Sequence, residues 1–374
     1  MTVARSPHRA WVEVDHAAIR ANVRVIRERA PQAQLIGVVK ANAYGHGDVA
    51  VSKAVLEAGA DALAVALPEE GARLRDAGLT CPVHLLFEAP PEAAPAVIEN
   101  DLTCTVYTMP FSEALSDAAL KAGTRVPLTI EVDTGMRRVG VFPEDALAFA
   151  LVIDKLPGIR IEAVSTHFPC ATKRGDAFTH AQIEEFELVS NDMQKALSRK
   201  LSRHMANSAG ALAFPESRLD AARVGIALYG LAPSDELADP DLLPALSLRG
   251  RVALVRRVKA GQGISYSHAF VLERDSNVAT IPAGYADGFS RLLSGKAEAL
   301  IRGKRYPVVG TICMDLSMVD LGDEPIEAGE EFVLIGEQGQ ESITADEVAG
   351  RLGTINYEVV CMIGPRVPRI FTGN

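Results

Sequence analysis

The feature that most constrains this chain is an alternation of short apolar runs and longer helix-patterned stretches from residue 35 to about residue 228. Short β-branched or apolar runs predict buried strands, and stretches with apolar residues three or four apart predict helices. Eight strand candidates follow one another here: 35–39, 61–66, 83–87, 103–107, 127–132, 160–166, 203–206 and 222–226. Eight such units predict an α/β fold in which a parallel sheet closes into a (β/α)8, or TIM, barrel.

Helix candidates lie between these strands, at 48–59, 68–78, 112–123 and 178–201. The first three end in a glycine, which is the residue that tolerates the left-handed conformation common just after a helix. The positions of these glycines therefore agree with the helices that the periodicity predicts.

The pattern changes after about residue 240. Pro240 and Pro244 mark a linker, and the rest of the chain consists mainly of short extended segments separated by Gly, Asp and Asn turns, with one short helix near 344–353. This pattern is typical of an all-β fold. We therefore expect two domains, a barrel over 1–240 and a mainly β domain over 241–374.

Composition excludes several classes of protein. The formal net charge of −10 argues against a nucleic-acid-binding protein, because phosphate contacts need a basic surface. No apolar run approaches the roughly 18 residues that span a bilayer, and no signal-peptide core is present near residue 1, so a cytoplasmic protein without membrane contact is expected. Five scattered cysteines without a CxxC pair give no reason to expect a metal site.

Catalytic residues of a TIM barrel lie at the carboxyl ends of its strands. The polar residues found there are Lys40, Glu131 with Asp133, His167, Asn207 with Ser208, and Arg223 with Gly225. Burial at a barrel mouth would favour the neutral, nucleophilic form of a lysine. A lysine that extends from the barrel rim into water is the alternative interpretation of Lys40.

Two neighbouring motifs add to this pattern. After Lys40, Tyr44 brings a hydroxyl, and Gly45 and Gly47 let the backbone approach a ligand closely. In RVGIALYG, Gly225 before a helical turn would present the N–H groups of Gly225 and Ile226 to a phosphate, although a simple turn is the alternative. A lysine that can form a Schiff base, together with a phosphate site, suggests pyridoxal 5′-phosphate.

At this point the chain resembles the bacterial alanine racemases, which are fold-type III pyridoxal-phosphate enzymes. The resemblance rests on VVKANAYGHG, DTGMRRVG, MANSAG, RVGIALYG, GYADGFSR, GTICMDLSMVD and CMIGPRVPRIF, which occur in the family's order over nearly the whole chain. It implies an isomerase that interconverts L- and D-alanine and supplies D-alanine for peptidoglycan. It also implies a homodimer in which the barrel of one chain faces the β domain of the other.

The resemblance implies two catalytic bases on opposite faces of the substrate, as racemisation requires. Lys40 would hold the cofactor covalently and act on the D isomer, and Tyr266, supplied by the partner subunit, would act on the L isomer. The residues expected to bind the cofactor phosphate are Tyr44, Ser208, Gly225, Ile226 and Tyr357, with Asn207 beside them.

The remaining expected roles also follow from the resemblance. Arg223 would face the pyridine nitrogen, His167 would lie beneath the ring, and a chain of contacts from Tyr266 through His167 to Arg223 would supply positive charge. Arg138 would bind the phenolic oxygen of the cofactor and the substrate. The other expected substrate-binding residues are Met314, through its backbone, and Tyr285 and Asp315, which would line the approach.

The chain departs from the family pattern at two places. Glu131 stands where much of the family has a lysine that becomes carbamylated, and its carboxylate would replace that group in holding Arg138. Ser267 and His268 follow Tyr266 where the family usually has a glycine and often an arginine.

Other functions remain to be separated from alanine racemisation. A broad-specificity or serine racemase of the same family would share these motifs. A fold-type III amino-acid decarboxylase would share the lysine and the two-domain plan, but its cysteine and aspartate usually lie in a different motif. A barrel that binds pyridoxal phosphate without catalysis would lack the β domain, and a protein-binding scaffold has only the acidic surface in its favour.

Overall fold

The computed structural model describes residues 9–373. The described chain forms two compact units, which do not follow a single cut in the sequence. One unit contains residues 18–43 and 48–243, and the other contains residues 9–17, 44–47 and 244–373. The expected domain boundary after residue 240 lies just before Pro244, where the second unit resumes, and the independence of the two domains stays a prediction.

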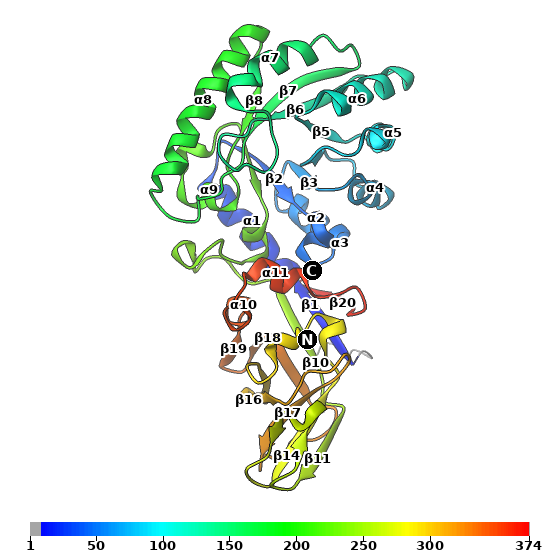
Figure 1. Ribbon diagram of the computed structural model, residues 1–374, viewed down its shortest axis with the longest axis vertical. Coiled ribbons are helices and arrows are strands. Elements are labelled where there is room, and N and C mark those ends of the chain that lie inside the picture. Colours follow the sequence, from blue (N-terminus) through cyan, green and yellow to red (C-terminus); the bar gives the residue numbers. More distant parts are fainter. Residues whose placement is uncertain (1–8, 374) are drawn as a thin grey trace. The chain divides into compact units, whose positions relative to one another are not determined.

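The first unit is a closed barrel of eight parallel strands, which confirms the predicted (β/α)8 fold (Figure 1). The strands are β2 (Gln34–Val38), β3 (Ala62–Val65), β4 (Val83–Leu85), β5 (Thr103–Val106), β6 (Val126–Glu131), β7 (Ile159–Ser165), β8 (Ser202–His204) and β9 (Ala221–Val224). Pairing of β9 with β2 closes the ring. All eight predicted strands are present, and in all of them except the short β8 most side chains are buried.

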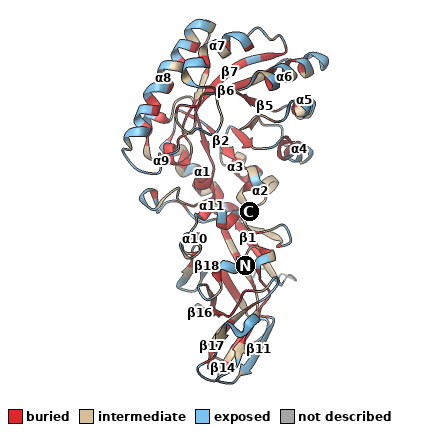
Figure 2. Ribbon diagram, viewed as in Figure 1, coloured by how far each residue is buried: buried red, intermediate tan, exposed pale blue. Residues whose placement is uncertain are grey.

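Helices cover the outside of the barrel (Figure 1). They are α1 (His16–Arg29), α3 (Asp48–Glu57), α4 (Pro68–Asp76), α5 (Ala94–Glu99), α6 (Met109–Lys121), α7 (Pro143–Ile153), α8 (Ala177–Leu197) and α9 (Ser208–Ala213), with short 3-10 turns η1 (Pro91–Ala93), η2 (Pro215–Ser217), η3 (Ile226–Tyr229) and η4 (Asp235–Leu237). The helices α7 and α8 turn exposed residues outward and buried ones toward the strands (Figure 2).

The predicted helix ends are confirmed by the backbone. Gly59, Gly78 and Gly123 follow α3, α4 and α6 with φ of +104°, +80° and +67°, a region in which other residues are strained. At the start of α8, the Asp176 carboxylate accepts a hydrogen bond from Thr179 N at 2.8 Å. Such a cap satisfies a helical N–H that has no partner within the helix.

The second unit is built on one large, mainly antiparallel sheet, as the sequence predicted. The strand order is β11-β14-β17-β16-β15-β18-β10-β1-β20, with β19 paired to β18 and a separate β12-β13 hairpin. The strands are β1 (Ala10–Asp15), β10 (Leu246–Arg251), β11 (Leu254–Val258), β12 (Gly263–Ile264), β13 (Phe270–Val271), β14 (Ser276–Ile281), β15 (Glu298–Ile301), β16 (Lys304–Val309), β17 (Ser317–Gly322), β18 (Glu331–Gln338), β19 (Glu341–Ile343) and β20 (Arg369–Thr372).

The helical segments of this unit are short. They are η5 (Tyr266–His268), η6 (Tyr285–Asp287), η7 (Arg291–Leu293), α10 (Ala345–Leu352) and α11 (Asn356–Cys361). The helix α10 matches the one predicted near 344–353 and begins at Thr344, whose hydroxyl accepts a hydrogen bond from Glu347 N. None of the described helices is both long and apolar enough to cross a membrane.

The segment after β2 has an unusual backbone. The element α2 (Lys40–Tyr44) contains Ala41, Asn42 and Ala43 with φ of 51°, 55° and 52°, and Tyr44 follows with φ 53°. Each non-glycine residue in this left-handed region costs roughly 1–2 kcal/mol. Strain of this kind persists only where the surroundings impose it, and it is concentrated at functional sites.

Candidate active site

The barrel brings the predicted polar residues to the same end of neighbouring strands. Lys40 comes two residues after β2, Glu131 ends β6, and His167 comes two residues after β7. Ser208 begins α9 just after β8, and Arg223 lies within β9. Because the strands are parallel, these positions meet at the carboxyl edge of the barrel.

Lys40 is held at the end of a well-fixed strand. The buried Tyr229 donates its hydroxyl to Val38 O at 2.8 Å, which anchors the last residue of β2. Lys40 Nζ lies 5.4 Å from the centre of the Phe87 ring, and Arg138 Cζ lies 5.1 Å from the same centre. Phe87 therefore lies within cation–π distance of both side chains. Nothing in the sequence distinguishes Phe87 from a core residue, because a phenylalanine at a strand end is usually buried.

Arg223 is the buried cation of the barrel, only 9% exposed. Its Nη1 donates to His204 O at 2.9 Å and its Nη2 to Thr166 O at 2.6 Å, so two backbone carbonyls fix the guanidinium plane. Burial lowers the pKa of Arg223, and the nearby Glu131 carboxylate opposes that change. An arginine remains charged in such a setting.

Three histidines near this cation are held neutral. Burial, followed by the charges of Arg223, Arg138 and Lys40, lowers the pKa of His167 to about 3. Burial and Arg223 lower the pKa of His84 to about 4 and that of His204 well below its ordinary value. Within residues 9–373, no hydrogen bond joins His167 to Arg223. The expected hydrogen-bonded contact between these two side chains is therefore not seen, and Arg223 affects His167 through its charge.

Glu131 is the buried carboxylate of this cluster. Its Oε2 accepts a hydrogen bond from the Ser165 hydroxyl on the neighbouring strand. Burial raises its pKa, whereas Arg223, the Ser165 hydrogen bond and Arg138 oppose the rise. The expected direct pairing with Arg138 is not seen: among the described residues, no ion pair within 4.0 Å joins the two side chains. Ser165 was not foreseen as its partner.

A set of hydrogen-bond donors lies beside Arg223. Ser208 Oγ accepts from Gly225 N at 3.0 Å and from Ala227 N at 3.5 Å. Ile226, which opens η3, is buried, and its N–H has no hydrogen-bond partner in the part of the chain described. Asn207 caps α9, accepting from Gly210 N at 2.9 Å. A buried N–H without a partner is costly and indicates a missing acceptor.

Tyr44 and Tyr357 belong to the second unit, where their ring centres lie 6.2 Å apart. Burial raises the pKa of Tyr44, and burial raises that of Tyr357 to about 12. Both phenols therefore keep their protons near neutral pH and can donate hydrogen bonds to an anion.

The glycines after Tyr44 serve a different purpose from the one expected. A Cβ on Gly45 would lie 2.3 Å from Val360 O, and one on Gly47 would lie 2.9 Å from the Phe371 ring. The two glycines therefore admit protein atoms to the backbone, not a ligand. This approach packs residues 44–47 against the carboxyl-terminal segment of the second unit.

Tyr266 begins the turn η5 between β12 and β13 and is 69% exposed. Ser265 before it has φ 66° and donates its hydroxyl to Thr311 O at 2.6 Å. Ser267 and His268 after it have φ of 58° and 46°. The side chain is thus presented by a strained, tightly bonded turn.

Tyr285, Met314 and Asp315 lie on two adjoining loops of the same unit. Tyr285 N donates to Cys313 O at 3.1 Å, and Ala286 N donates to Met314 O at 3.0 Å. Tyr285 is 42% and Met314 52% exposed. The structure thus brings these three predicted substrate residues together on one surface.

The arrangement falls into two groups. The barrel unit gathers Lys40, Arg138 and Arg223 around neutral His167, with Glu131 as the carboxylate that acts on Arg223 and Arg138. The second unit carries the tyrosines and the exposed loops. A barrel mouth with an excess of positive charge and the unpartnered N–H of Ile226 is suited to an anionic ligand.

The family models that match this chain are described as the alanine racemase N-terminal domain, over residues 14–233, and the alanine racemase C-terminal domain, over residues 245–371. The chain is similar to the alanine racemase of Desulfovibrio desulfuricans, with 43% identity over 364 residues, covering 96% of this chain and 97% of that protein.

Solved structures agree with these matches. The crystal structure of alanine racemase from Streptomyces lavendulae superposes with a TM-score of 0.93 at 39% identity, covering 99% of this chain and 98% of that one. The alanine racemase of Bartonella henselae, described with covalently bound pyridoxal phosphate, has a TM-score of 0.88 at 28% identity, with coverage of 98% and 100%.

Proposed function

The chain belongs to the alanine racemase family, whose members are pyridoxal-phosphate-dependent isomerases that interconvert L- and D-alanine, and we propose that Lys40 and Tyr266 are its two catalytic bases. The observation that carries this proposal is the cluster of Lys40, Arg138 and Arg223 around the neutral His167 at the barrel mouth. A phosphate-bearing cofactor and a carboxylate substrate both need such a positive site.

The residues present fit pyridoxal phosphate. The unpartnered N–H of the buried Ile226, with Gly225, Ser208 and Asn207 beside it, supports phosphate binding here, and the protonated Tyr44 and Tyr357 would complete the donor set. Lys40 would hold the group covalently, Arg223 would contact its ring nitrogen, His167 would lie against its ring, and Arg138 would bind its phenolic oxygen. When bound, this group withdraws electrons from the substrate and makes the α-proton removable.

The chain's own residues then divide the proton transfers. Lys40 Nζ would remove or return the α-proton of the D isomer, and Tyr266 Oη would do so for the L isomer from the opposite face. Met314, through its backbone, and Arg138 would hold the substrate carboxylate, while Tyr285 and Asp315 would line its approach. The neutral His167, which interacts electrostatically with Lys40, would add no further positive charge near that amine.

We propose that the active enzyme is a homodimer in which Tyr266 enters the partner's barrel. The second unit exposes large apolar side chains on the loops that carry the proposed substrate residues, namely Tyr266, Tyr285, Leu292, Met314 and Leu316, and others are exposed on the barrel unit. A partner subunit docked on these loops would bury apolar surface that is otherwise in contact with water. A cytoplasmic location and a supply of D-alanine for peptidoglycan stay predictions from the family resemblance.

The deciding experiment follows optical rotation of L- and D-alanine, and then of serine, in the presence of pyridoxal phosphate. We expect conversion of both alanine isomers, and conversion of serine at a similar rate would favour a broad-specificity racemase. Lys40→Ala should abolish racemisation and the visible absorbance of the lysine-bound cofactor. Lys53→Ala, which removes an exposed lysine from α3, should change neither. Bound cofactor with no conversion of either alanine isomer would refute the proposal.

A further inference from the structure

The two loops that carry Tyr285, Met314 and Asp315 form one platform, which we define as residues 284–288 and 313–315. Two backbone hydrogen bonds join the loops, from Tyr285 N to Cys313 O and from Ala286 N to Met314 O. They also pack without space for a side chain, because a Cβ on Gly284 would lie 2.4 Å from both Cys313 O and Met314 O. The two loops of the platform are therefore expected to move together.

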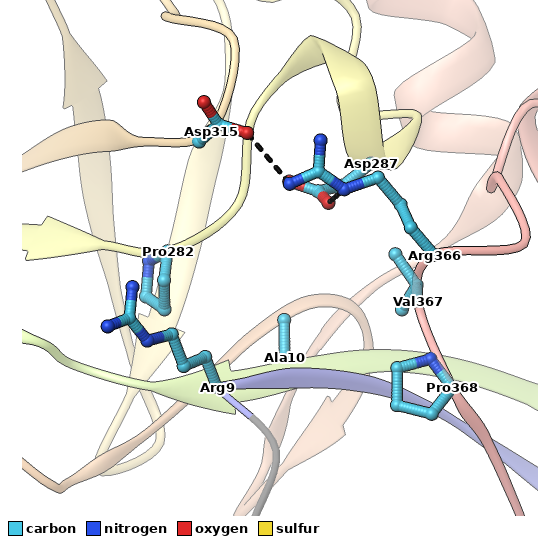
Figure 3. A pocket seen from close by; sticks show the side chains of 8 residues that line it. All are labelled: Arg9, Ala10, Pro282, Asp287, Asp315, Arg366, Val367 and Pro368. Atoms are coloured by element: carbon cyan, nitrogen blue, oxygen red, sulfur yellow. Dashed lines mark hydrogen bonds and ion pairs between the residues drawn. The ribbon is translucent and has the colours of Figure 1, made fainter.

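A third segment ties the platform together from outside. Arg366 Nε lies 3.1 Å from Asp287 Oδ1, and Arg366 Nη2 lies 2.7 Å from Asp315 Oδ1. Figure 3 shows the guanidinium group between the two carboxylates, one from each loop. The other oxygen of Asp287 accepts from Gly284 N at 2.9 Å, so this carboxylate holds its own turn as well as the arginine.

The space beside the two ion pairs of Arg366 is not close-packed. A cavity of about 200 Å³ lies beside it, lined by Arg9, Ala10, Pro282, Asp287, Asp315, Arg366, Val367 and Pro368. Because open space lies on that side, close packing there contributes less to fixing Asp315 relative to Asp287, and the ion pairs contribute correspondingly more.

We propose that Arg366 is a positioning residue for substrate binding: by spanning Asp287 and Asp315, it holds the ends of the two loops that lie beyond their backbone hydrogen bonds, and so fixes how Tyr285 and Met314 are presented. The inference rests on the proposed function, which assigns these loops to the substrate. An arginine is needed because its forked guanidinium reaches two carboxylates at once, whereas a lysine offers one point charge. Arg366 acts on the fit of the substrate, and Lys40 and Tyr266 transfer the protons.

The test compares Arg366→Gln and Arg366→Lys with Arg302→Gln. Arg302 is a matched control, because its side chain is also 51% exposed and also makes two contacts with a carboxylate, that of Glu330. Exposed ion pairs contribute little to overall stability, so all three variants should fold. We expect Arg366→Gln to raise KM for both alanine isomers about tenfold with kcat changed less than about twofold, and Arg366→Lys to fall between.

One further readout separates positioning from general damage. Because enantiomers have equal free energy, kcat/KM falls by the same factor in both directions for any variant, so this equality checks the assay only. In hydrogen exchange, peptides covering 284–288 and 313–316 should exchange faster in Arg366→Gln and not in Arg302→Gln. An unchanged KM in Arg366→Gln, or an equal rise in Arg302→Gln, would overturn the inference. If the parent protein converts no alanine, the proposed function fails, and hydrogen exchange still decides whether Arg366 holds the platform.

Discussion

The turn around Tyr266 concentrates backbone strain in three residues that flank this side chain. Ser265, Ser267 and His268 all have positive φ, and a Cβ on Gly263 would lie 2.3 Å from His268 Cγ. The turn is held by the Ser265 hydroxyl on Thr311 O and by this tight contact. The position after Tyr266, which the family usually fills with glycine, is here a serine in a glycine conformation.

Replacing Ser267 with glycine should stabilise the protein. The left-handed backbone of Ser267, at φ 58° and ψ 14°, costs roughly 1–2 kcal/mol of folding free energy. A glycine removes this cost but loses roughly 0.5–1 kcal/mol because it has more conformational freedom in the unfolded chain. The net gain is about 0–1.5 kcal/mol, measured as a higher urea midpoint at unchanged slope. Ser267→Ala keeps the strain and is the control. Equal midpoints for the glycine and alanine variants would mean that the strain is absent in solution.

Glu131 predicts how the enzyme responds to bicarbonate. By the family resemblance, Glu131 supplies a permanent carboxylate where a carbamylated lysine is usual. In the described part of the chain, it is hydrogen-bonded to Ser165 and is influenced by the charges of Arg223 and Arg138, without an ion pair to Arg138. Activity should therefore be the same with and without added bicarbonate. The check is to degas the enzyme at low pH and assay it before and after bicarbonate is restored. Recovery that depends on bicarbonate would show that the Glu131 carboxylate does not fill this role.

At the scale of elements, local pattern and long-range pairing differ in what a sequence reveals. The barrel strands were predictable because each is a compact apolar run, and the end of α4 because Gly78 adopts a left-handed conformation. The strand β1 was not predicted. It pairs with β10 and β20, which lie more than two hundred residues away, and the sequence near Ala10 contains no sign of those partners. Lys40 was found from its place after a strand, whereas Phe87 and Ser165 act through neighbours that only the fold supplies.

Two histidines on the barrel strands make the stability of the protein depend on pH. His84 on β4 and His204 on β8 have ring centres 6.1 Å apart, and both are kept neutral by burial beside Arg223. Their folded-state pKa lies below the unfolded value of about 6.5, so the unfolded chain binds more protons as the pH falls. Their contribution to stability is therefore complete above pH 6.5 and is lost as the pH falls toward about 4, the folded pKa of His84.

Removing one of these histidines should flatten the acid side of the stability curve. Between about pH 7 and pH 5, His84→Gln should lose about 1–2 kcal/mol less unfolding free energy than the parent. Urea unfolding at a series of pH values measures this difference. His180→Gln, which removes a side chain that is 49% exposed, should not reduce the loss. A parallel pH dependence for His84→Gln and the parent would mean that His84 is protonated in the folded barrel.

At the scale of the whole molecule, the net charge of the chain and the charge of the proposed site have opposite signs. The chain carries a net charge of −10, yet the barrel mouth gathers Lys40, Arg138 and Arg223. The proposed bases also belong to different units, since Lys40 lies in the barrel unit and Tyr266 in the other. A chain that divides its catalytic groups in this way can complete a site by assembling with a second copy.

This division predicts that two inactive variants restore activity when mixed. In a heterodimer of Lys40→Ala and Tyr266→Phe, one site receives Lys40 from the second variant and Tyr266 from the first, while the other site lacks both. Random exchange makes half of the dimers mixed, with one good site of two, so activity should recover to about a quarter of the parent's. Subunits are unfolded together, refolded with pyridoxal phosphate and assayed for alanine racemisation, with each variant refolded alone as the control. If Tyr266 served its own chain, neither subunit of the mixed dimer would hold both bases, and the mixture would remain as inactive as its parts.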